Sequence, residues 1–228
     1  MLKKLVITID GPAGAGKSTA SKALAARLSC NYLDTGALYR AFAYKAKKEG
    51  VSPDNDEGLS AMGQRVNIRL QNKHDKPVVF VDDEEVTDEI RTEEISILAS
   101  TVSARPCVRQ ILFALQREAI KDGGIVAEGR DMGTVVFPDA DCKFFLDASI
   151  AERAKRRFLE LVAKNSRCDY EQVEKDLLAR DKQDRERHIA PLIPAPDAII
   201  IDSTGMTVRE VVDKITDLIR LQIPQRDV

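Results

Sequence analysis

The chain reads Gly11-Pro12-Ala13-Gly14-Ala15-Gly16-Lys17-Ser18 close to its start, and this stretch decides the fold. It matches the pattern G-x-x-x-x-G-K-[ST] in full. The run 5–9 before it is β-branched and apolar without alternation, which is typical of a strand buried on both faces of a parallel sheet. Small and apolar residues recur at helical spacing after it, from Lys17 to Leu28. Strand, glycine loop and helix together predict the start of a βαβ unit that binds phosphate.

The residue types of this loop suit a nucleoside triphosphate. Glycines let backbone N–H groups turn inward around a phosphate, and the following helix adds its positive end at the same point. We expect Lys17 to reach the β and γ phosphates and the hydroxyl of Ser18 to ligate Mg²⁺. The predicted nucleotide-binding stretch comprises Gly11, Pro12, Ala13, Gly14, Ala15, Gly16, Lys17, Ser18 and Thr19.

Short apolar runs return later in the chain, each separated from the next by helical patterning. They lie at 31–33, 125–127, 143–146 and 198–201. With the first strand they predict a five-stranded parallel sheet with helices on both faces, that is, a three-layer α/β fold.

One acidic segment, residues 54–98, does not fit this alternation. It holds twelve acidic and five basic residues. Residues 65–71 and 77–81 alternate or run apolar around a turn at 72–76, which predicts an exposed antiparallel hairpin. We interpret the segment as an insert into the α/β fold.

A second unusual segment, residues 151–190, is rich in arginine. Seven guanidinium groups in a helical stretch indicate phosphate handling, because the planar fork bonds phosphate oxygens in pairs. The alternative is a solvated helix with i,i+4 ion pairs such as Glu152 with Arg156. The seven are Arg153, Arg156, Arg157, Arg167, Arg180, Arg185 and Arg187.

Composition excludes several classes of protein. The 228 residues have a net charge of −2, which argues against wholesale nucleic-acid binding, and no apolar run approaches a membrane span. The four cysteines form no close pair and only two histidines are present, so a His/Cys metal centre is disfavoured. The first apolar run is too short for a signal peptide. We expect a cytoplasmic protein, monomeric by default.

The strand at 124–130 ends in one acid, Glu128, which could hold Mg²⁺ through water or cap a neighbouring loop. Arginines far apart in sequence, Arg40, Arg109 and Arg130, would meet at the carboxyl ends of the strands. A small kinase needs such charges to hold a triphosphate donor and an anionic acceptor. Where the acceptor is itself a phosphate, its oxygen is already ionised and no catalytic base is required.

Together with the phosphate loop, three further motifs resemble the bacterial cytidylate kinase family from about Lys4 to about Leu221. They read Asp34-Thr35-Gly36-Ala37-Leu38-Tyr39-Arg40, then Glu128-Gly129-Arg130-Asp131-Met132-Gly133-Thr134-Val135-Val136-Phe137-Pro138, then Arg180-Asp181-Lys182-Gln183-Asp184-Arg185. The resemblance implies the adenylate-kinase-like fold of phosphate-loop NTPases. Its core would span 1–34 and 100–228 with a short helical lid at about 151–168, and its monophosphate-binding domain would span 35–99 with the acidic hairpin.

The resemblance also implies the reaction, transfer of the γ-phosphoryl group of MgATP to CMP or dCMP. It assigns the cytosine to Ser100, Arg109 and Asp131, the pentose to Arg180 and Asp184, and the acceptor phosphate to Arg40, Arg130 and Arg187 with Thr35 nearby. Lys17 and Arg130, with Arg156 and Arg157 of the lid, would be catalytic. Arg153 lies in the same lid segment, whose closure would bring one or more of these three arginines onto the transferring phosphoryl group. Ser18 and Glu128 would hold the metal, the latter through water.

Two other functions stay open at this point. One is a related kinase for UMP, AMP or a small metabolite such as shikimate. The other is a nucleotide-dependent binding module that docks a partner on the acidic insert. We expect ATP and CMP or dCMP as the only partners, with neither nucleic acid nor membrane.

Overall fold

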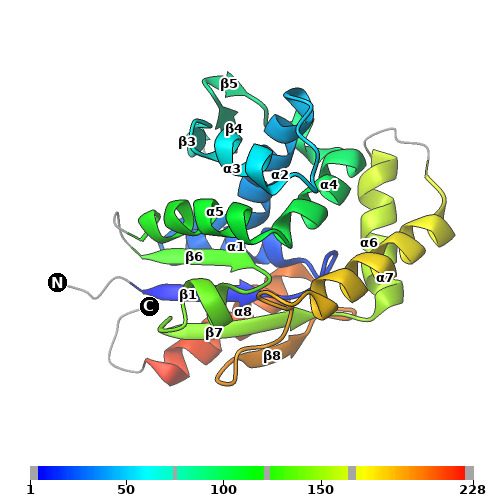
Figure 1. Cartoon of the computed structure of the whole chain (residues 1–228). Helices are drawn as coiled ribbons and strands as arrows, with labels where there is room; N and C mark the ends of the chain where they lie inside the picture. The colour runs from blue at the N-terminus through cyan, green and yellow to red at the C-terminus, as the bar shows by residue number, and fades with distance from the viewer. Residues whose placement is uncertain (1–4, 74–75, 121–123, 164–167, 224–228) are drawn as a thin grey trace. The chain divides into compact units, whose positions relative to one another are not determined.

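The computed structural model describes residues 5–73, 76–120, 124–163 and 168–223 (Figure 1). Contacts divide the chain into two compact units. The first consists of Met1–Leu33 with Ala119–Val228, and the second of Asp34–Glu118.

The first unit is built on a five-stranded parallel sheet in the order β2-β6-β1-β7-β8 (Figure 1). Its strands are β1 Val6–Asp10, β2 Asn31–Asp34, β6 Ile125–Gly129, β7 Cys142–Asp147 and β8 Ile199–Asp202. All five runs predicted from the sequence form these strands, so the predicted α/β fold with a five-stranded parallel sheet is confirmed. The central strand β1 lies between β6 and β7, which explains why its residues are apolar without alternation.

Two helices bury one face of this sheet. They are α1 Lys17–Arg27 and α8 Val208–Gln222, which share one apolar core with β1, β6, β7 and β8. Thr207 and Glu210 form a reciprocal capping box that starts α8.

Two further helices, α6 Ile150–Ala163 and α7 Tyr170–Glu186, pack on each other over a small core of their own. Buried Ala154 on α6 contacts Val173 and Leu177 on α7, and Ala13 of the phosphate loop packs against this cluster. The segment predicted as a lid coincides with α6, but residues 164–167, and Arg167 with them, lie outside the described residues. Its role as a lid stays a prediction.

The second unit combines four helices with a small sheet. The helices are α2 Thr35–Lys48, α3 Asp56–Gly63, α4 Glu93–Ser103 and α5 Pro106–Glu118, with a short 3₁₀ turn at Glu89–Arg91. The predicted hairpin is present as β3 Ile68–Lys73 and β4 Lys76–Val81, and β5 Glu84–Glu85 pairs with β4.

The boundaries of the two units differ from those expected of the domains. Residues 100–118, grouped with the core on sequence, lie in the second unit. The reason is packing: Val108 and Leu112 of α5 are fully buried, and α5 contacts α2, α3 and α4. At Gly63 of α3 an added Cβ would lie 2.2 Å from Ile111. That this unit binds the monophosphate stays a prediction.

None of the helices within the described ranges is both long and apolar enough to cross a membrane.

Candidate active site

The phosphate loop follows β1 and requires glycine at its first position. Gly11 has a φ of +146°, and a Cβ there would lie 2.0 Å from the carbonyl oxygen of Leu146 on β7. Gly16 takes a left-handed φ of 89° directly before α1. The first N–H groups of α1 therefore face the loop, as an anion site at a helix N-terminus requires.

Lys17 is buried within this loop. Its Nζ donates a hydrogen bond of 2.7 Å to the carbonyl oxygen of Pro12. Burial lowers the pKa of the Lys17 amine to about 7, and the positive charge of Arg130 acts in the same direction. Glu128 and Asp10 favour the charged amine. Phosphate oxygens at this point would favour it further, because they add negative charge.

Glu128 lies at the end of β6 and is 3% exposed. Its carboxylate accepts hydrogen bonds from the hydroxyl of Ser18, at 3.0 Å, and from the hydroxyl of Tyr32. The predicted pair of metal-binding groups, Ser18 and Glu128, is therefore in contact. The alternative predicted for Glu128, that it caps a neighbouring loop, also agrees with these contacts, because Ser18 and Tyr32 belong to two other segments.

These two residues fit a magnesium ion that takes most of its ligands from elsewhere. Hydroxyl and carboxylate oxygens are the hard donors that Mg²⁺ prefers. No group of three or more His, Cys, Asp or Glu residues that could hold a metal occurs within the part of the chain that the structure describes. Mg²⁺ at this point would thus be held by Ser18, water and phosphate oxygens, with Glu128 beside it, which is its usual manner of binding in kinases.

A buried cluster of arginines and carboxylates lies where β6 ends and where α7 ends. Arg130 donates to Asp184 at 2.8 Å, while Arg187 lies 3.7 Å from Asp131 and 3.9 Å from Asp184. Burial alone would raise the pKa of Asp184, but the guanidinium groups of Arg130, Arg180 and Arg187 hold it below its ordinary value. The structure thus brings together five of the predicted CMP-binding residues, which are separated by up to about 57 positions in the sequence. They are Arg130, Asp131, Arg180, Asp184 and Arg187.

Two arginines of α6, Arg153 and Arg156, contact the phosphate loop. Arg156 donates to the carbonyl oxygen of Ala15 at 3.4 Å, to Ser203 at 3.1 and 2.8 Å, and pairs with Glu152 at 2.9 Å. Arg156 therefore makes both contacts: the i,i+4 ion pair with Glu152 that a solvated helix would have, and a hydrogen bond to the phosphate loop. Arg157 pairs with exposed Glu160 at 3.3 Å. The catalytic roles of Arg156 and Arg157 stay predictions.

Two further charged residues lie beside the loop. Arg153, one of the three arginines of the predicted lid, is buried and donates to the carbonyl oxygen of Ala13 at 3.2 Å and to Asp181 at 2.7 Å. Asp10, the last residue of β1, is also buried and accepts backbone N–H groups from the segment after Asp131. The only signal for Asp10 in the sequence is an acid at the end of an otherwise apolar strand.

The remaining predicted residues lie in the second unit. Asp34 caps α2 by accepting the N–H of Ala37 at 2.8 Å and pairs with Arg40 at 3.2 Å. The guanidinium of Arg109 lies 5.8 Å from the ring centre of Tyr39.

Ser100 on α4 and Thr35 at the start of α2 are also buried in this unit. The hydroxyl of Ser100 has no hydrogen-bond partner among the residues that the structure describes. That Thr35, Arg40, Ser100 and Arg109 meet the arginine cluster of the first unit around one ligand stays a prediction.

Residues 72–75 read Asn-Lys-His-Asp, which fits the N-K-x-D pattern of guanine-reading GTPases. Asn72 and Lys73 are the last residues of β3 and pair with β4 in the three-stranded sheet, and residues 74–75 lie outside the described residues. Because the phosphate loop belongs to the other sheet, the pattern here does not indicate a guanine site.

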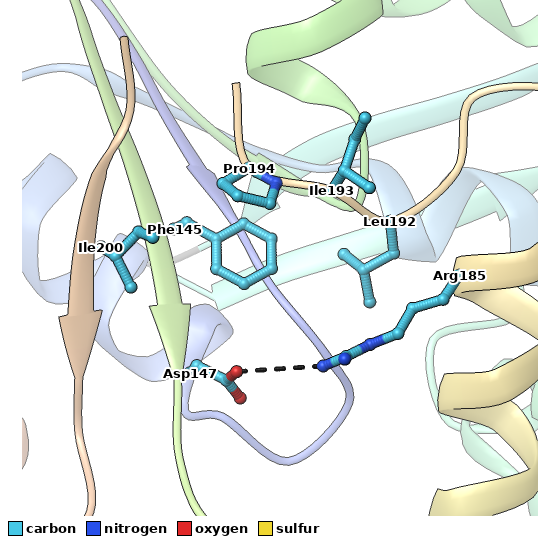
Figure 2. A pocket seen from close by; sticks show the side chains of 7 residues that line it. All are labelled: Phe145, Asp147, Arg185, Leu192, Ile193, Pro194 and Ile200. Atoms are coloured by element: carbon cyan, nitrogen blue, oxygen red, sulfur yellow. Dashed lines mark ion pairs between the residues drawn. The ribbon is translucent and has the colours of Figure 1, made fainter. Parts of the chain in front are cut away.

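One pocket of about 320 Å³ lies beside β7 and β8 (Figure 2). It borders the groups described above, because its lining residue Leu192 donates its N–H to the carbonyl oxygen of Asp184 at 2.8 Å. Apolar side chains form most of its wall, namely Phe145, Leu192, Ile193, Pro194 and Ile200. The ion pair of Arg185 with Asp147, at 4.0 Å, lies at one end. Arg185, one of the seven arginines of the arginine-rich segment, lines this pocket, and none of the residues assigned to ATP, CMP or the metal does.

The parallel sheet, the glycine loop and the Lys17-Ser18 pair define a phosphate-loop protein that binds a nucleoside triphosphate. The model of the cytidylate kinase family matches residues 7–221. The chain belongs to the cytidylate kinase family, and the resemblance predicted from its motifs is confirmed.

Curated relatives cover nearly the whole chain. A cytidylate kinase of Geobacter sulfurreducens is 47% identical over 95% of this chain and 93% of its own, and one of Desulfitobacterium hafniense is 47% identical over 96% and 94%. The solved structure of an uncharacterized protein from Eubacterium ventriosum shares the fold, with a TM-score of 0.52 at 13% identity over 95% of this chain and 98% of that one. The predicted enzyme class, a kinase that phosphorylates a nucleoside monophosphate, is confirmed by the family.

Proposed function

We propose that this kinase transfers the γ-phosphoryl group of MgATP to CMP or dCMP and releases ADP with CDP or dCDP. The observation that carries the proposal is the buried cluster of Arg130, Asp131, Asp184 and Arg187 in a member of this family. It supplies positive charge for a phosphate and a buried carboxylate for a base.

On the donor side, the phosphate loop and Lys17 hold the triphosphate. Lys17 exchanges its bond to the carbonyl oxygen of Pro12 for the β and γ phosphate oxygens. Mg²⁺, when bound beside Ser18 and Glu128, neutralises phosphate charge. Arg156 already donates to the loop, and we assign it, with Arg157, to the charge of the transferring group.

On the acceptor side, Arg40, Arg130 and Arg187 hold the monophosphate, with the hydroxyl of Thr35 beside it. The attacking oxygen of the monophosphate is already ionised, so these residues orient it and need not remove a proton. The pentose lies against Arg180 and Asp184, which are four residues apart on one face of α7. Because its pKa is held low, Asp184 stays ionised and accepts hydrogen bonds from the sugar hydroxyl.

Asp131, Arg109 and Ser100 read the base. Cytosine presents its N4 amine as a donor, which the Asp131 carboxylate accepts, while N3 and O2 accept from Arg109. Uracil presents an oxygen at C4 and an N–H at N3, so the same residues face the wrong partners. The mismatch costs about 1–3 kcal/mol, and discrimination against UMP is expected to be partial.

The experiment is ADP release from MgATP with CMP, dCMP, UMP, AMP, GMP or shikimate as the single acceptor. Release with CMP and dCMP, weaker release with UMP, and little with the purines or shikimate is the expected result. Turnover of another acceptor in preference to CMP contradicts the assignment of the base. ATP binding without turnover of any acceptor favours the binding module instead.

Among residues 34–73 and 76–118 of the second unit, no contact favours that module over an enzyme. The acidic residues around β5 pair with lysines of α2 within the same unit, Asp82 with Lys45 at 2.6 Å and Glu84 with Lys48. Cytoplasmic location, a monomeric state and the absence of nucleic-acid partners stay predictions.

A further inference from the structure

Asp10 joins two segments that the proposed function treats separately. It ends β1 directly before Gly11 of the phosphate loop, and it is 4% exposed. One carboxylate oxygen accepts the N–H of Met132 and the other accepts the N–H of Gly133, each at 2.8 Å. These are the first two peptide groups after Asp131, so both oxygens of one side chain fix the backbone that leaves the base-reading residue.

That backbone has an uncommon form which needs such support. Asp131 has φ −146° and ψ 24°, and residues Met132–Val136 form a π-helical turn in which Val136 and Phe137 donate to carbonyl oxygens five residues earlier. Turns of this kind are rare and concentrate at functional sites. The N–H groups at the start of a helical turn have no partner within the turn, and Asp10 supplies acceptors for two of them.

The same segment is confined from the side of β1. A Cβ on Gly133 would lie 3.0 Å from the hydroxyl of Thr8 and 3.2 Å from Cδ of Lys143. The peptide after Asp131 therefore has little room to move away from Asp10. Its position is set by β1, which lies more than a hundred residues earlier in the chain, and by β7, the next strand after it.

We propose that Asp10 is a positioning residue for acceptor selectivity: by holding the peptides after Asp131, it aims the Asp131 carboxylate at the base of the monophosphate. This rests on the proposed function, which assigns Asp131 to the base. Because Asp10 also directly precedes the phosphate loop, it links the base-reading segment to the loop that holds the triphosphate.

The chemistry of the contact requires a carboxylate. Two neighbouring N–H donors need two acceptors, and an ionised carboxylate provides both. An asparagine has the same shape, but it offers one acceptor and turns an NH₂ group toward the second N–H. We call the two hydrogen bonds from Met132 and Gly133 to Asp10 the clamp. Asp10→Asn keeps the side-chain volume, so it breaks one of these two bonds and leaves the packing of β1 in place.

The test is a double-mutant cycle between Asp10→Asn and Asp131→Asn, read as the ratio of kcat/KM for CMP to that for UMP. Asp10→Asn should reduce this ratio by about tenfold and raise the KM for CMP, with the KM for ATP within about twofold of wild type. The double variant should match Asp131→Asn alone, since Asp10 acts through Asp131. Independent, multiplicative losses, or equal rises in both KM values, overturn the proposal, because a general loosening of the fold would produce them.

Asp141→Asn is the matched control. Asp141 accepts the N–H of Val6 at 3.0 Å, at the opposite end of β1. An asparagine oxygen can still accept this bond, and Asp141 lies far from Asp131 along β1, so selectivity and both KM values should stay within about twofold of wild type. Hydrogen exchange of residues 130–137 in the protein without nucleotide should quicken in Asp10→Asn and not in Asp141→Asn. Unchanged exchange in Asp10→Asn overturns the clamp itself.

The outcomes separate the two proposals. If the wild type shows no preference for CMP over UMP, the proposed function fails and the positioning role fails with it. A preference that Asp131→Asn relaxes and Asp10→Asn leaves intact overturns the positioning role alone. Should Asp10→Asn not fold, Gly133→Ala displaces the same peptides against Thr8, and the same loss of selectivity is expected; an unaltered ratio in Gly133→Ala overturns the proposal.

Discussion

Replacing Asp10 with asparagine removes a charge that the folded protein holds at a cost in stability. Burial raises the pKa of Asp10 from 3.8 to about 6, Asp131 adds repulsion, and the N–H groups of Gly133 and Met132 offset only part of it. At 1.36 kcal/mol per pKa unit, this corresponds to about 3 kcal/mol between fully protonated and fully ionised Asp10.

The sign follows from proton binding. Between about pH 4 and pH 6 the folded chain holds a proton on Asp10 that the unfolded chain has released, so wild-type stability falls as pH rises. Asparagine cannot ionise, so the variant lacks this loss. The free energy of unfolding of the wild type should therefore fall relative to that of Asp10→Asn by about 1.4 kcal/mol from pH 5 to pH 8, and the rest of the difference lies below pH 5.

Urea unfolding at pH 5, 6, 7 and 8 measures the gap, that is, the difference in free energy of unfolding between the wild type and the variant. Equal m-values are the check that both chains unfold alike. Asp202→Asn is the control, because hydrogen bonds from the Thr204 side chain and backbone hold the pKa of Asp202 below its ordinary value. Its contribution is lost only at lower pH, so its gap to wild type should stay constant from pH 5 to pH 8. A constant gap for Asp10→Asn, or one that widens against the variant as pH rises, refutes the reasoning. The expected result would mean that the ionised Asp10 carboxylate, which the proposed selectivity requires, lowers the free energy of unfolding.

Three further substitutions test the assigned roles. Lys17→Ala should lower kcat by about 10²–10³-fold in the ADP-release assay, because it removes the charge over the β and γ phosphates; near-normal turnover contradicts the loop assignment. Asp131→Asn should lower kcat/KM for CMP by about 10–100-fold with little change in the KM for ATP, whereas equal losses on both substrates would show that the residue does not read the base. Arg180→Ala should raise the KM for CMP by about tenfold in steady-state kinetics, and an unchanged KM would return this residue to a surface role.

The parts of the molecule that the sequence predicts are those with a local cause. The run 5–9, the glycines and Lys17 lie within one stretch of thirteen residues, and the strand, loop and helix that they specify are all present. The hairpin at β3 and β4 follows in the same way from alternation around a turn. The family follows from whole motifs, and the family model matches the chain over nearly the span those motifs predict.

The parts that the sequence does not predict depend on side chains that meet across the fold. Residues 100–118 belong to the second unit because the apolar face of α5 packs against α3 and α4. Helical periodicity predicts that a helix has an apolar face, but it does not predict which element packs against that face. Arg153 and Asp181 are two charges in a segment full of charges, and only packing selects them as a buried pair.

The sequence by itself determined the phosphate loop, the parallel strands and the kinase family, because these rest on patterns within short stretches of the chain. Only the tertiary structure decided that Asp10 holds the peptides after Asp131, 122 and 123 residues further along the chain. The physical reason is that two buried N–H groups must find acceptors, and which acceptor reaches them depends on the neighbouring strands β1 and β6, whose residues Asp10 and Gly129 lie side by side in register.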